Sequence, residues 1–477
     1  MLNYAFDPTI VNPISARVGQ QVMGGLRFAG VDGAPDRPWK YDKNNYQLRT
    51  GLAYSINEKT VLRAGWGQYY LNPTGQGSNN GFSQSTNLIA SNDGNRTPTY
   101  ALANPFPNGI QAPTGSSLGP LTFLGRGPSF SNPNFVLPNV HQFSVGIQRE
   151  LPFRISLDMT YAGSRTLCDQ QVANPFVGVP GFEGTTRFTN AQISRFDLAR
   201  PFPAFGGFSM NQQNLGKMTY DSMQLVANKR WTKGVTINVG YTWVPRWTED
   251  GANTTTGIGA AYVDEVSLLK NHGPYFSQRK HRITASGVWE LPWYRNQRSV
   301  AGYLLGGWSI APMFVFQSGQ PWDMPGNVEL IVDPKVAALS GKKAGQFMYG
   351  VKPCVADRNA NTGVYQLLSV STAYGCTEPY FLVRQPFERR KTQFRYDEFR
   401  RPSFWQVDMN FAKTTQIAHN VRFQLRLEAF NLFNSPMYDE RNYNQTTTSA
   451  DFGRINRNIT GQSNFQRFIQ LGFRLIF

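Results

Sequence analysis

The residues of this sequence best suited to metal binding or acid–base chemistry are four scattered histidines: His141, His272, His281 and His419. A zinc protease needs two histidines one helical turn apart with a glutamate between them, and a structural zinc site needs closely spaced cysteine and histidine pairs. Neither spacing occurs in the sequence. We therefore expect each histidine to lie in a loop or on a water-facing wall, and we expect no metal.

Motifs for nucleotide binding and for nucleophilic catalysis do not occur either. The sequence contains no GxxxxGKS or GxxxxGKT phosphate loop. Its GxSxG spacing at residues 115–119 (GSSLG) lies in a Gly-, Pro- and Asn-rich segment and not between a strand and a helix, as a nucleophile elbow requires. The stretch GIGAAY from Gly257 lacks the third glycine of a dinucleotide site. Asp264 and Glu265 are adjacent acids, but a solvated pair in a loop explains them better than acid–base catalysis does. The sequence predicts no active site, no enzyme activity and no cofactor.

The three cysteines leave two interpretations open. Cys354 and Cys376 lie in one polar segment and could form a disulfide in an oxidising compartment, which would leave Cys168 over. Three unpaired thiols are an equally good interpretation.

The net charge of +17 arises from 47 Lys and Arg against 30 Asp and Glu. Such a charge attracts nucleic acid, anionic lipid or an acidic partner. The basic residues are spread along the whole chain, and no recognition motif or basic helix accompanies them. We therefore expect no nucleic-acid partner.

One regular polar pattern remains, near the carboxyl terminus. Four polar residues alternate with three apolar ones: Arg422, Gln424, Arg426 and Glu428 alternate with Phe423, Leu425 and Leu427. Alternation places the two sets on opposite faces of a β-strand. The polar set is the best candidate for a functional surface that contacts another protein domain or an anionic solute. A self-neutralising ladder that only stiffens a wall is the alternative.

The strand that positions this pattern is one of many. Clear alternation occurs at residues 46–56, 142–148, 155–161, 235–243, 405–411 and 421–430, and in the last strand through Ile469, Leu471, Phe473, Leu475 and Phe477. Weaker strand patterns occur at residues 24–29, 60–70, 222–230, 282–291 and 308–316. The sequence thus predicts an all-β fold of about twelve antiparallel strands. The 45 Gly, 30 Pro and 14% aromatic content suit this class.

The connections between these strands alternate in length. Short turns are expected at residues 57–59, 151–153, 232–234 and 417–420, and long Gly-, Pro- and Asn-rich loops at 71–139, 162–218, 320–402 and 433–466. No run reaches the roughly 18 apolar residues of a membrane helix, and the first residues, MLNYAFDPTIVNP, do not read as a signal peptide. Short turns at one end and long loops at the other are typical of outer-membrane β-barrels.

Alternation alone does not say whether the apolar face meets lipid or a protein core. Three observations favour lipid: charged residues beside glycines on the polar face, aromatic residues near strand ends, and an apolar stripe that continues to the last residue. We therefore expect the lumen-facing polar residues to be Arg49, Arg422, Gln424, Arg426, Glu428 and Arg474. We expect the lipid-facing residues to include Phe423, Leu425, Leu427, Leu471, Phe473 and Leu475. The aromatic residues expected at the headgroup layer are Tyr54, Tyr161, Tyr241, Trp243, Trp289 and Trp405.

The last strand is the place where a barrel would close. An unpaired backbone group in hydrocarbon costs several kcal/mol, so every strand must be paired. We therefore expect the last strand to be fixed rather than frayed, with Phe477 at its periplasmic end.

With these residues in view, the sequence resembles the barrel of TonB-dependent outer-membrane transporters of the Oar-like group. The stretches that carry the resemblance are KTVLRAGWGQYY (59–70), HRITASGVWELP (281–292), LLGGWSIAPMFVFQSGQP (304–321), RLEAFNLFN (426–434) and the aromatic-terminated last strand. The resemblance implies that Phe477 is a barrel-assembly signal and that the visible strands are the last part of a 22-stranded barrel with long extracellular loops. It also implies an amino-terminal plug domain and a TonB-contacting segment, and neither they nor a signal peptide are expected within residues 1–477.

The expected function follows from this resemblance. The chain would be the carboxyl-terminal barrel part of an outer-membrane receptor that takes up a large solute such as an oligosaccharide, a peptide or a metal chelate. Its partners would be outer-membrane lipid, the unidentified solute and, only through a plug, the TonB system of a Gram-negative-type bacterium. An independent passive pore or structural barrel is one alternative, and a secreted soluble glycan-binding β-protein is another.

Overall fold

The structure is a computed structural model of the 477-residue chain. It describes residues 3–36, 40, 42–71, 81–173, 202–206, 208–250, 273–294, 297–325, 328–339, 343–344, 347–359, 362–384, 392–393, 395–418, 421–436, 444, 446–449, 452–455 and 466–477.

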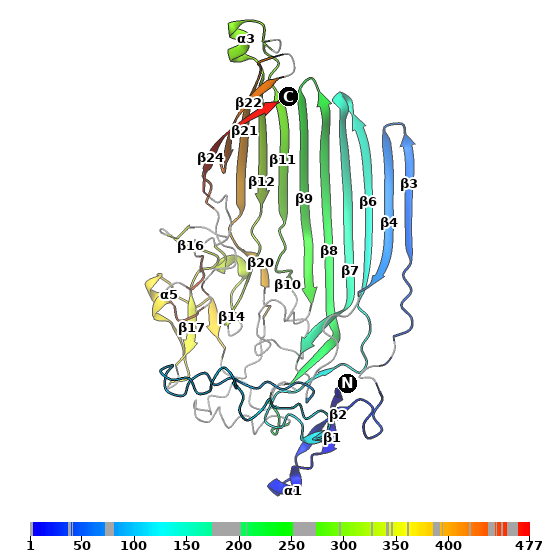
Figure 1. Ribbon diagram of the computed structural model, residues 1–477, viewed down its shortest axis with the longest axis vertical. Coiled ribbons are helices and arrows are strands. Elements are labelled where there is room, and N and C mark those ends of the chain that lie inside the picture. Colours follow the sequence, from blue (N-terminus) through cyan, green and yellow to red (C-terminus); the bar gives the residue numbers. More distant parts are fainter. Residues whose placement is uncertain are drawn as a thin grey trace.

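One large sheet dominates these described residues, with 13 strands in all. Its continuous path runs in the order β24-β22-β21-β12-β11-β9-β8-β7-β6-β4-β3, and every neighbouring pair on it is antiparallel. The strands of this path are β3 (Arg49–Asn57), β4 (Thr60–Tyr70), β6 (Asn139–Leu151), β7 (Ile155–Ala173), β8 (Ser209–Thr232), β9 (Val235–Asp250), β11 (His281–Glu290), β12 (Trp308–Gln317), β21 (Phe404–Gln416), β22 (Arg422–Phe430) and β24 (Phe468–Ile476). Figure 1 shows them side by side as one broad layer.

The two ends of this sheet differ in their connections. At the turn end, uppermost in Figure 1, short connections join β3 to β4, β6 to β7, β8 to β9 and β21 to β22, as the sequence predicts. Two of these connections have only two residues between paired strands, and in the β8–β9 connection these are Lys233 and Gly234, both with positive φ (51° and 81°). That backbone is the one two-residue hairpins need, and the 3₁₀ turn η2 (Pro152–Arg154) serves the β6–β7 connection.

The connection from β11 to β12 also lies at the turn end but is longer. It contains the short helix α3 (Val300–Leu305), which begins where the Ser299 side chain accepts a hydrogen bond from the Gly302 N–H. Figure 1 places this helix beyond the strand ends, near the carboxyl terminus.

One prediction about the strands of the barrel needs correction. Residues 24–29 were expected to form a barrel strand, but β2 (Met23–Phe28) pairs only with β1 (Asn3–Val11) in a separate two-stranded hairpin. Among the described residues no pairing joins β3 to β24, so the sheet is open, and neither the count of about twelve strands nor the 22-stranded barrel is confirmed. Gly24 and Gly25 explain part of the difference, because a Cβ at either position would overlap Phe6 or Pro120 in the hairpin packing.

The loop end, lower in Figure 1, holds more regular structure than the sequence suggests. β7 and β8 continue pairing beyond the predicted strand ends, so part of the loop expected at 162–218 is strand. Two short strands join the sheet there: β10 (Gly273–Pro274) pairs with β9, and β5 (Ser129–Ser131) pairs in parallel with β8. The small elements α1 (Ser15–Val18) and η1 (Gly119–Leu121) also lie at this end.

The loop expected at 320–402 is a folded region, which we call the cap. It contains β13 (Pro321–Asp323), β14 (Val328–Leu330), α4 (Pro334–Ala337), β15 (Lys343–Ala344), β16 (Phe347–Tyr349), β17 (Val355–Arg358), β18 (Tyr365–Leu367), α5 (Ser369–Ala373), β19 (Phe381–Val383) and β20 (Arg395–Arg400), and it is joined by β23 (Arg454–Ile455). Its core is apolar, with Trp322, Phe381, Phe399 and Phe452 fully buried.

A second core at the loop end consists mainly of phenylalanines. Phe6 of β1 packs on Phe202, Phe205 and Phe208, with ring centroids 4.5 to 5.2 Å apart. This packing attaches the β1–β2 hairpin to the loop that leads into β8.

Within the described ranges, no helix combines the length and the apolar character needed to cross a membrane.

Candidate functional site

The register of the sheet gathers the polar residues of β22 and β24 on one face. Gln424 lies opposite Arg474, Arg426 opposite Gly472 and Glu428 opposite Gln470. We call this set the polar ladder: Arg422, Gln424, Arg426, Glu428, Gln470 and Arg474. Five of the six residues predicted to face a lumen are thus brought together.

Hydrogen bonds and one ion pair connect the ladder across three strands. The guanidinium of Arg426 lies 3.3 Å from a carboxylate oxygen of Glu428, whose other oxygen accepts a hydrogen bond from the Gln470 amide. The Gln424 amide donates to the Thr414 hydroxyl at 3.1 Å. A Cβ at Gly472 would make an ordinary van der Waals contact with the Arg426 guanidinium, at 3.8 Å, so this position tolerates a small side chain.

The charges of the ladder do not cancel. It holds three arginines against the single carboxylate of Glu428, and that carboxylate pairs with Arg426. The Arg426 side chain remains 38% exposed, so it is accessible to water. The arrangement is therefore a positively charged, hydrated strip that could bind an anionic group or an acidic protein surface.

The opposite face of the same strands is apolar. Phe423 lies opposite Leu475, Leu425 opposite Phe473 and Leu427 opposite Leu471, and the rings of Phe423 and Phe473 stack with centroids 6.1 Å apart. These are the residues predicted to face lipid, and we call their side of the sheet the apolar face.

The apolar face continues across the middle of the sheet, where each strand is paired on both sides. Val145 lies opposite Tyr161 and Ile147 opposite Met159, and the same parity passes through Met223 to Trp243 and Ile237. These side chains are 38% to 50% exposed among the described residues. A water-soluble protein would rarely leave so large a continuous apolar surface uncovered.

Aromatic residues lie at both ends of the apolar face. Toward the loop end, Trp66 stacks with His141 and Tyr241 stacks with His281, whose Nδ1 is 2.9 Å from the Tyr241 hydroxyl. Toward the turn end, Trp289 lies on β11, eight residues beyond His281, which corresponds to roughly 26 Å along a strand. Two aromatic belts at about this separation match the apolar band of an outer-membrane barrel.

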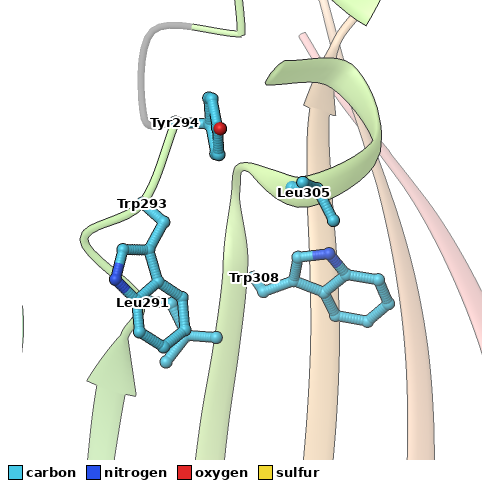
Figure 2. Close-up of a pocket in the computed structure, with 5 residues that line it drawn as sticks. All are labelled: Leu291, Trp293, Tyr294, Leu305 and Trp308. Carbon is cyan, nitrogen blue, oxygen red and sulfur yellow. The ribbon is translucent and has the colours of Figure 1, made fainter. Parts of the chain in front are cut away.

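The turn-end belt surrounds a pocket of about 380 Å³, shown in Figure 2. It is lined by Leu291, Trp293, Tyr294, Leu305 and Trp308. Figure 2 shows Leu291 and Trp293 on one side of the pocket and Leu305 and Trp308 on the other, so the β11–β12 connection forms both walls. Lys413 lies beside it, with its ammonium 5.8 Å from the centre of the Trp308 ring.

Arg49, the sixth predicted lumen residue, lies far from the polar ladder. It is on β3, at the other edge of the sheet, where its guanidinium lies 4.7 Å above the Tyr69 ring. Arg49 shares the polar parity, since it pairs with Gly67, but it does not contribute to the same surface.

Sequence reasoning did not identify a buried charge cluster that joins the cap to the sheet. Arg395 of β20 is paired with Glu249 of β9 and with Asp323 of β13, and Arg401 lies 4.0 Å from Asp323. Burial by itself lowers the pKa of Arg395, but the carboxylates of Asp323 and Glu249 outweigh it and raise that pKa above its ordinary value. No sequence pattern reveals these pairs, because their members are separated by 72 and 146 positions.

Cys354 and Cys376 form a disulfide in the cap, one of the two possibilities that the sequence leaves open. Of the scattered histidines, His141 and His281 lie in strands, in the aromatic belt of the apolar face, so the expectation of a loop or a water-facing wall is wrong for these two. His272, His419, Asp264, Glu265 and the GIGAAY stretch lie outside the described residues. Within the residues that can be examined, no three His, Cys, Asp or Glu side chains are grouped as a metal site would require.

A large antiparallel sheet with one exposed apolar face, one polar face and aromatic belts at both ends is the architecture typical of an outer-membrane β-barrel wall. The sequence profile of the outer membrane beta barrel domain matches residues 2–470. The chain belongs to this family, and it is a protein of the outer membrane.

Several solved structures resemble the chain at low identity. The ferric-catecholate import receptor Fiu of Escherichia coli K12 matches with 10% identity and a TM-score of 0.35, over 90% of this chain and 34% of that one. The outer membrane transporter YddB of Escherichia coli matches with 10% identity and a TM-score of 0.37, over 89% of this chain and 40% of that one. The FrpB iron transporter of Neisseria meningitidis matches with 10% identity and a TM-score of 0.36, over 90% and 39%.

The chain thus spans about a third to two fifths of the length of these structures. No curated protein matches the chain in sequence.

Proposed function

We propose that the chain supplies the carboxyl-terminal barrel strands of an Oar-like TonB-dependent receptor, which binds and takes up a large solute. In this proposal the apolar face meets lipid and the polar ladder faces the lumen. The plug domain would occupy this lumen and the solute would pass through it. The chain acts as a receptor and transporter rather than as an enzyme.

The observation that supports this proposal best is the asymmetry of the two faces. The apolar face stays exposed on strands that are paired on both sides, whereas the opposite face carries the unneutralised arginines of the polar ladder. A positive, hydrated wall suits an acidic plug surface or an anionic solute. The stretches that resemble TonB-dependent transporters, from residues 59–70 to the last strand, connect this wall to that class.

The direction of the edge strands gives further support. β3 and β24 both run from the loop end to the turn end, so they could pair with one another only in parallel. Antiparallel closure needs at least one more strand running the other way. A larger barrel, as in the TonB-dependent class, meets this need.

Photo-crosslinking in cells tests the proposal. A benzophenone amino acid at position 474, on the polar ladder, should form an adduct with a plug domain that mass spectrometry identifies. The same amino acid at position 473, on the apolar face, should form no protein adduct.

A passive pore would give a different outcome. Position 474 would then crosslink only to the chain itself, and purified protein in liposomes would let arabinose through in a swelling assay. That combination would contradict the receptor proposal in favour of an independent pore.

A further inference from the structure

A charged cluster interrupts the apolar face near the loop end. Asp221 of β8 accepts a hydrogen bond from the Tyr161 hydroxyl at 2.7 Å and one from the Arg165 guanidinium at 2.8 Å. The guanidinium of Arg246 on β9 lies 3.6 Å from the other oxygen of Asp221. Charged groups on a surface that otherwise suits lipid require an explanation.

The register places this cluster on the apolar face and not on the polar one. Asp221 lies opposite Gly163, and two residues further toward the turn end Met223 lies opposite Tyr161. The Tyr161 hydroxyl reaches Asp221 from that apolar row.

The cluster lies at the boundary of the apolar band. One row of paired residues contains Trp66, Phe143 and Gly163, and the next row toward the loop end contains Gln68, His141 and Arg165. The first row holds the aromatic side chains and continues to Asp221, which lies opposite Gly163, and the second row carries hydrogen-bond donors. A change from aromatic side chains to hydrogen-bond donors is expected where the acyl chains of the bilayer end and the headgroups begin.

The two arginines have different environments. Arg165 is held firmly: it also donates to the carbonyl oxygens of Ser164 and Tyr220, and it lies 5.3 Å above the Phe143 ring. Arg246 is 60% exposed, and within the described residues Asp221 is its one charged partner. Asp221 therefore orients two guanidinium groups, and the cluster keeps a net positive charge with Arg246 open to a ligand.

We propose that the cluster of Arg165, Asp221 and Arg246 binds the phosphate of a phosphorylated glycolipid in the outer leaflet. Guanidinium groups bind phosphate oxygens in pairs of parallel hydrogen bonds. The apolar side chains below the cluster, Tyr161 and Met223, lie where the acyl chains of that lipid would run. This position beside hydrocarbon favours a lipid over free phosphate, and the proposal depends on the apolar face meeting lipid.

Binding of lipid A to the full chain tests this inference. Wild-type protein extracted from outer membranes would be placed in phosphatidylcholine nanodiscs that contain bis-phosphorylated lipid A, and native mass spectrometry would count the lipid A retained per protein. Arg246→Gln should lower the retained lipid about fivefold, which is the effect of losing one basic residue at a membrane surface. Arg149→Gln is the matched control, because Arg149 shares the outward parity but lies near the turn end, and it should change nothing.

Two further arms separate the possible outcomes. Dephosphorylated lipid A should bind the unaltered chain about as weakly as bis-phosphorylated lipid A binds Arg246→Gln, and millimolar inorganic phosphate should not displace the phosphorylated lipid. Equal retention by both lipids, equal loss with Arg149→Gln, or displacement by free phosphate would each overturn the proposal. The lipid arms use the unaltered chain, so they decide even if Arg246→Gln does not assemble.

A separate measurement tests whether the apolar face meets water and not lipid. If it meets water, a cysteine at Met159, on the same face below the cluster, should react with a water-soluble maleimide and not with a bilayer-soluble one. That result would contradict the proposed function as well, whereas loss of the lipid effect alone would contradict only the phosphate site.

Discussion

The sheet and the cap are parts of one chain, but their side chains suit different solvents. Val145 and Ile237 lie in the middle of the sheet and are 50% and 43% exposed, whereas Trp322, Phe381 and Phe399 of the cap are 0% exposed. The cap follows the rule of soluble proteins, in which large apolar residues are buried. The sheet does not, and a lipid environment resolves the difference because it makes apolar exposure favourable.

The two regions also differ in what holds them together. The cap has an apolar core, a disulfide and the buried ion pairs of Arg395. The sheet relies on backbone pairing between strands and, in our account, on lipid. Changes to the cap core should therefore destabilise the cap alone, and this separation can be tested in order of expected effect.

The largest effect is expected at the centre of the cap. Trp322 packs edge-on against Phe399 and Phe452 with ring centroids 6.2 Å away, and Trp322→Ala should cost the cap about 3 to 5 kcal/mol. Limited proteolysis should then cleave residues 320–402 while strand circular dichroism of the sheet stays unchanged. Val364→Ala, at a 60% exposed position of the cap, is the control and should have little effect. Loss of sheet signal with Trp322→Ala would show that the two regions fold as one unit.

The next effect concerns the ion pairs between the cap and β9. Arg395→Met would leave Glu249 and Asp323 buried without their main partner, which should cost about 3 kcal/mol or more. Urea unfolding followed by fluorescence would measure the loss. Lys280→Met is the comparison, because Lys280 pairs with the half-exposed Asp397 and such pairs contribute about 0 to 1 kcal/mol. Equal losses in both variants would argue against a buried junction.

A somewhat smaller loss is expected on removing the disulfide. Cys354 and Cys376 are 22 positions apart, and a loop of this size corresponds to about 3 kcal/mol in the chain-entropy account. The double change to serine should lower the melting temperature of the cap and abolish its sensitivity to reductant. Cys168→Ser should leave that sensitivity intact, and a cap that melts at the same temperature with and without reductant would contradict the expectation.

The smallest effect is expected at the start of α4. The Asp333 side chain accepts a hydrogen bond from the Lys335 N–H at 2.8 Å, and Asp333→Ala should cost about 1 kcal/mol. Thermal melting of the cap would detect this as a shift of a few degrees. Lys335→Ala keeps the Asp333 carboxylate at the start of the helix, so this variant should melt close to the unaltered chain. Identical melting of all three proteins would contradict the role assigned to Asp333.

The sequence predicted most of the sheet because alternation is a local signal. Each strand from β3 to β24 on the main path corresponds to a predicted segment, and the parity of Leu425 and Gln424 agrees with the register. The segment at 24–29 was assigned wrongly to the barrel, because a glycine-rich strand pattern does not reveal its partner.

The cap and the charge clusters could not be predicted in the same way. The cap strands β14, β17 and β19 have three or four residues each, too few for alternation to be recognised. Asp221 and Arg165 occupy apolar-parity positions, and only their proximity in the folded sheet makes them a cluster. Long-range pairs of this kind have no spacing rule in the sequence.

The central claim is that the apolar face meets lipid, and a pair of lysine substitutions on one strand tests it most directly. Leu425→Lys places a charge on the apolar face, opposite Lys413, and should cost up to about 2 to 4 kcal/mol, the value for a lysine at the bilayer midplane, whereas Gln424→Lys adds a charge to the polar ladder and should be mild. The measurement is the amount of folded protein in outer-membrane fractions, scored by its heat-modifiable mobility. We expect Leu425→Lys to be lost from the membrane and Gln424→Lys to be retained; equal tolerance of both changes would contradict the account.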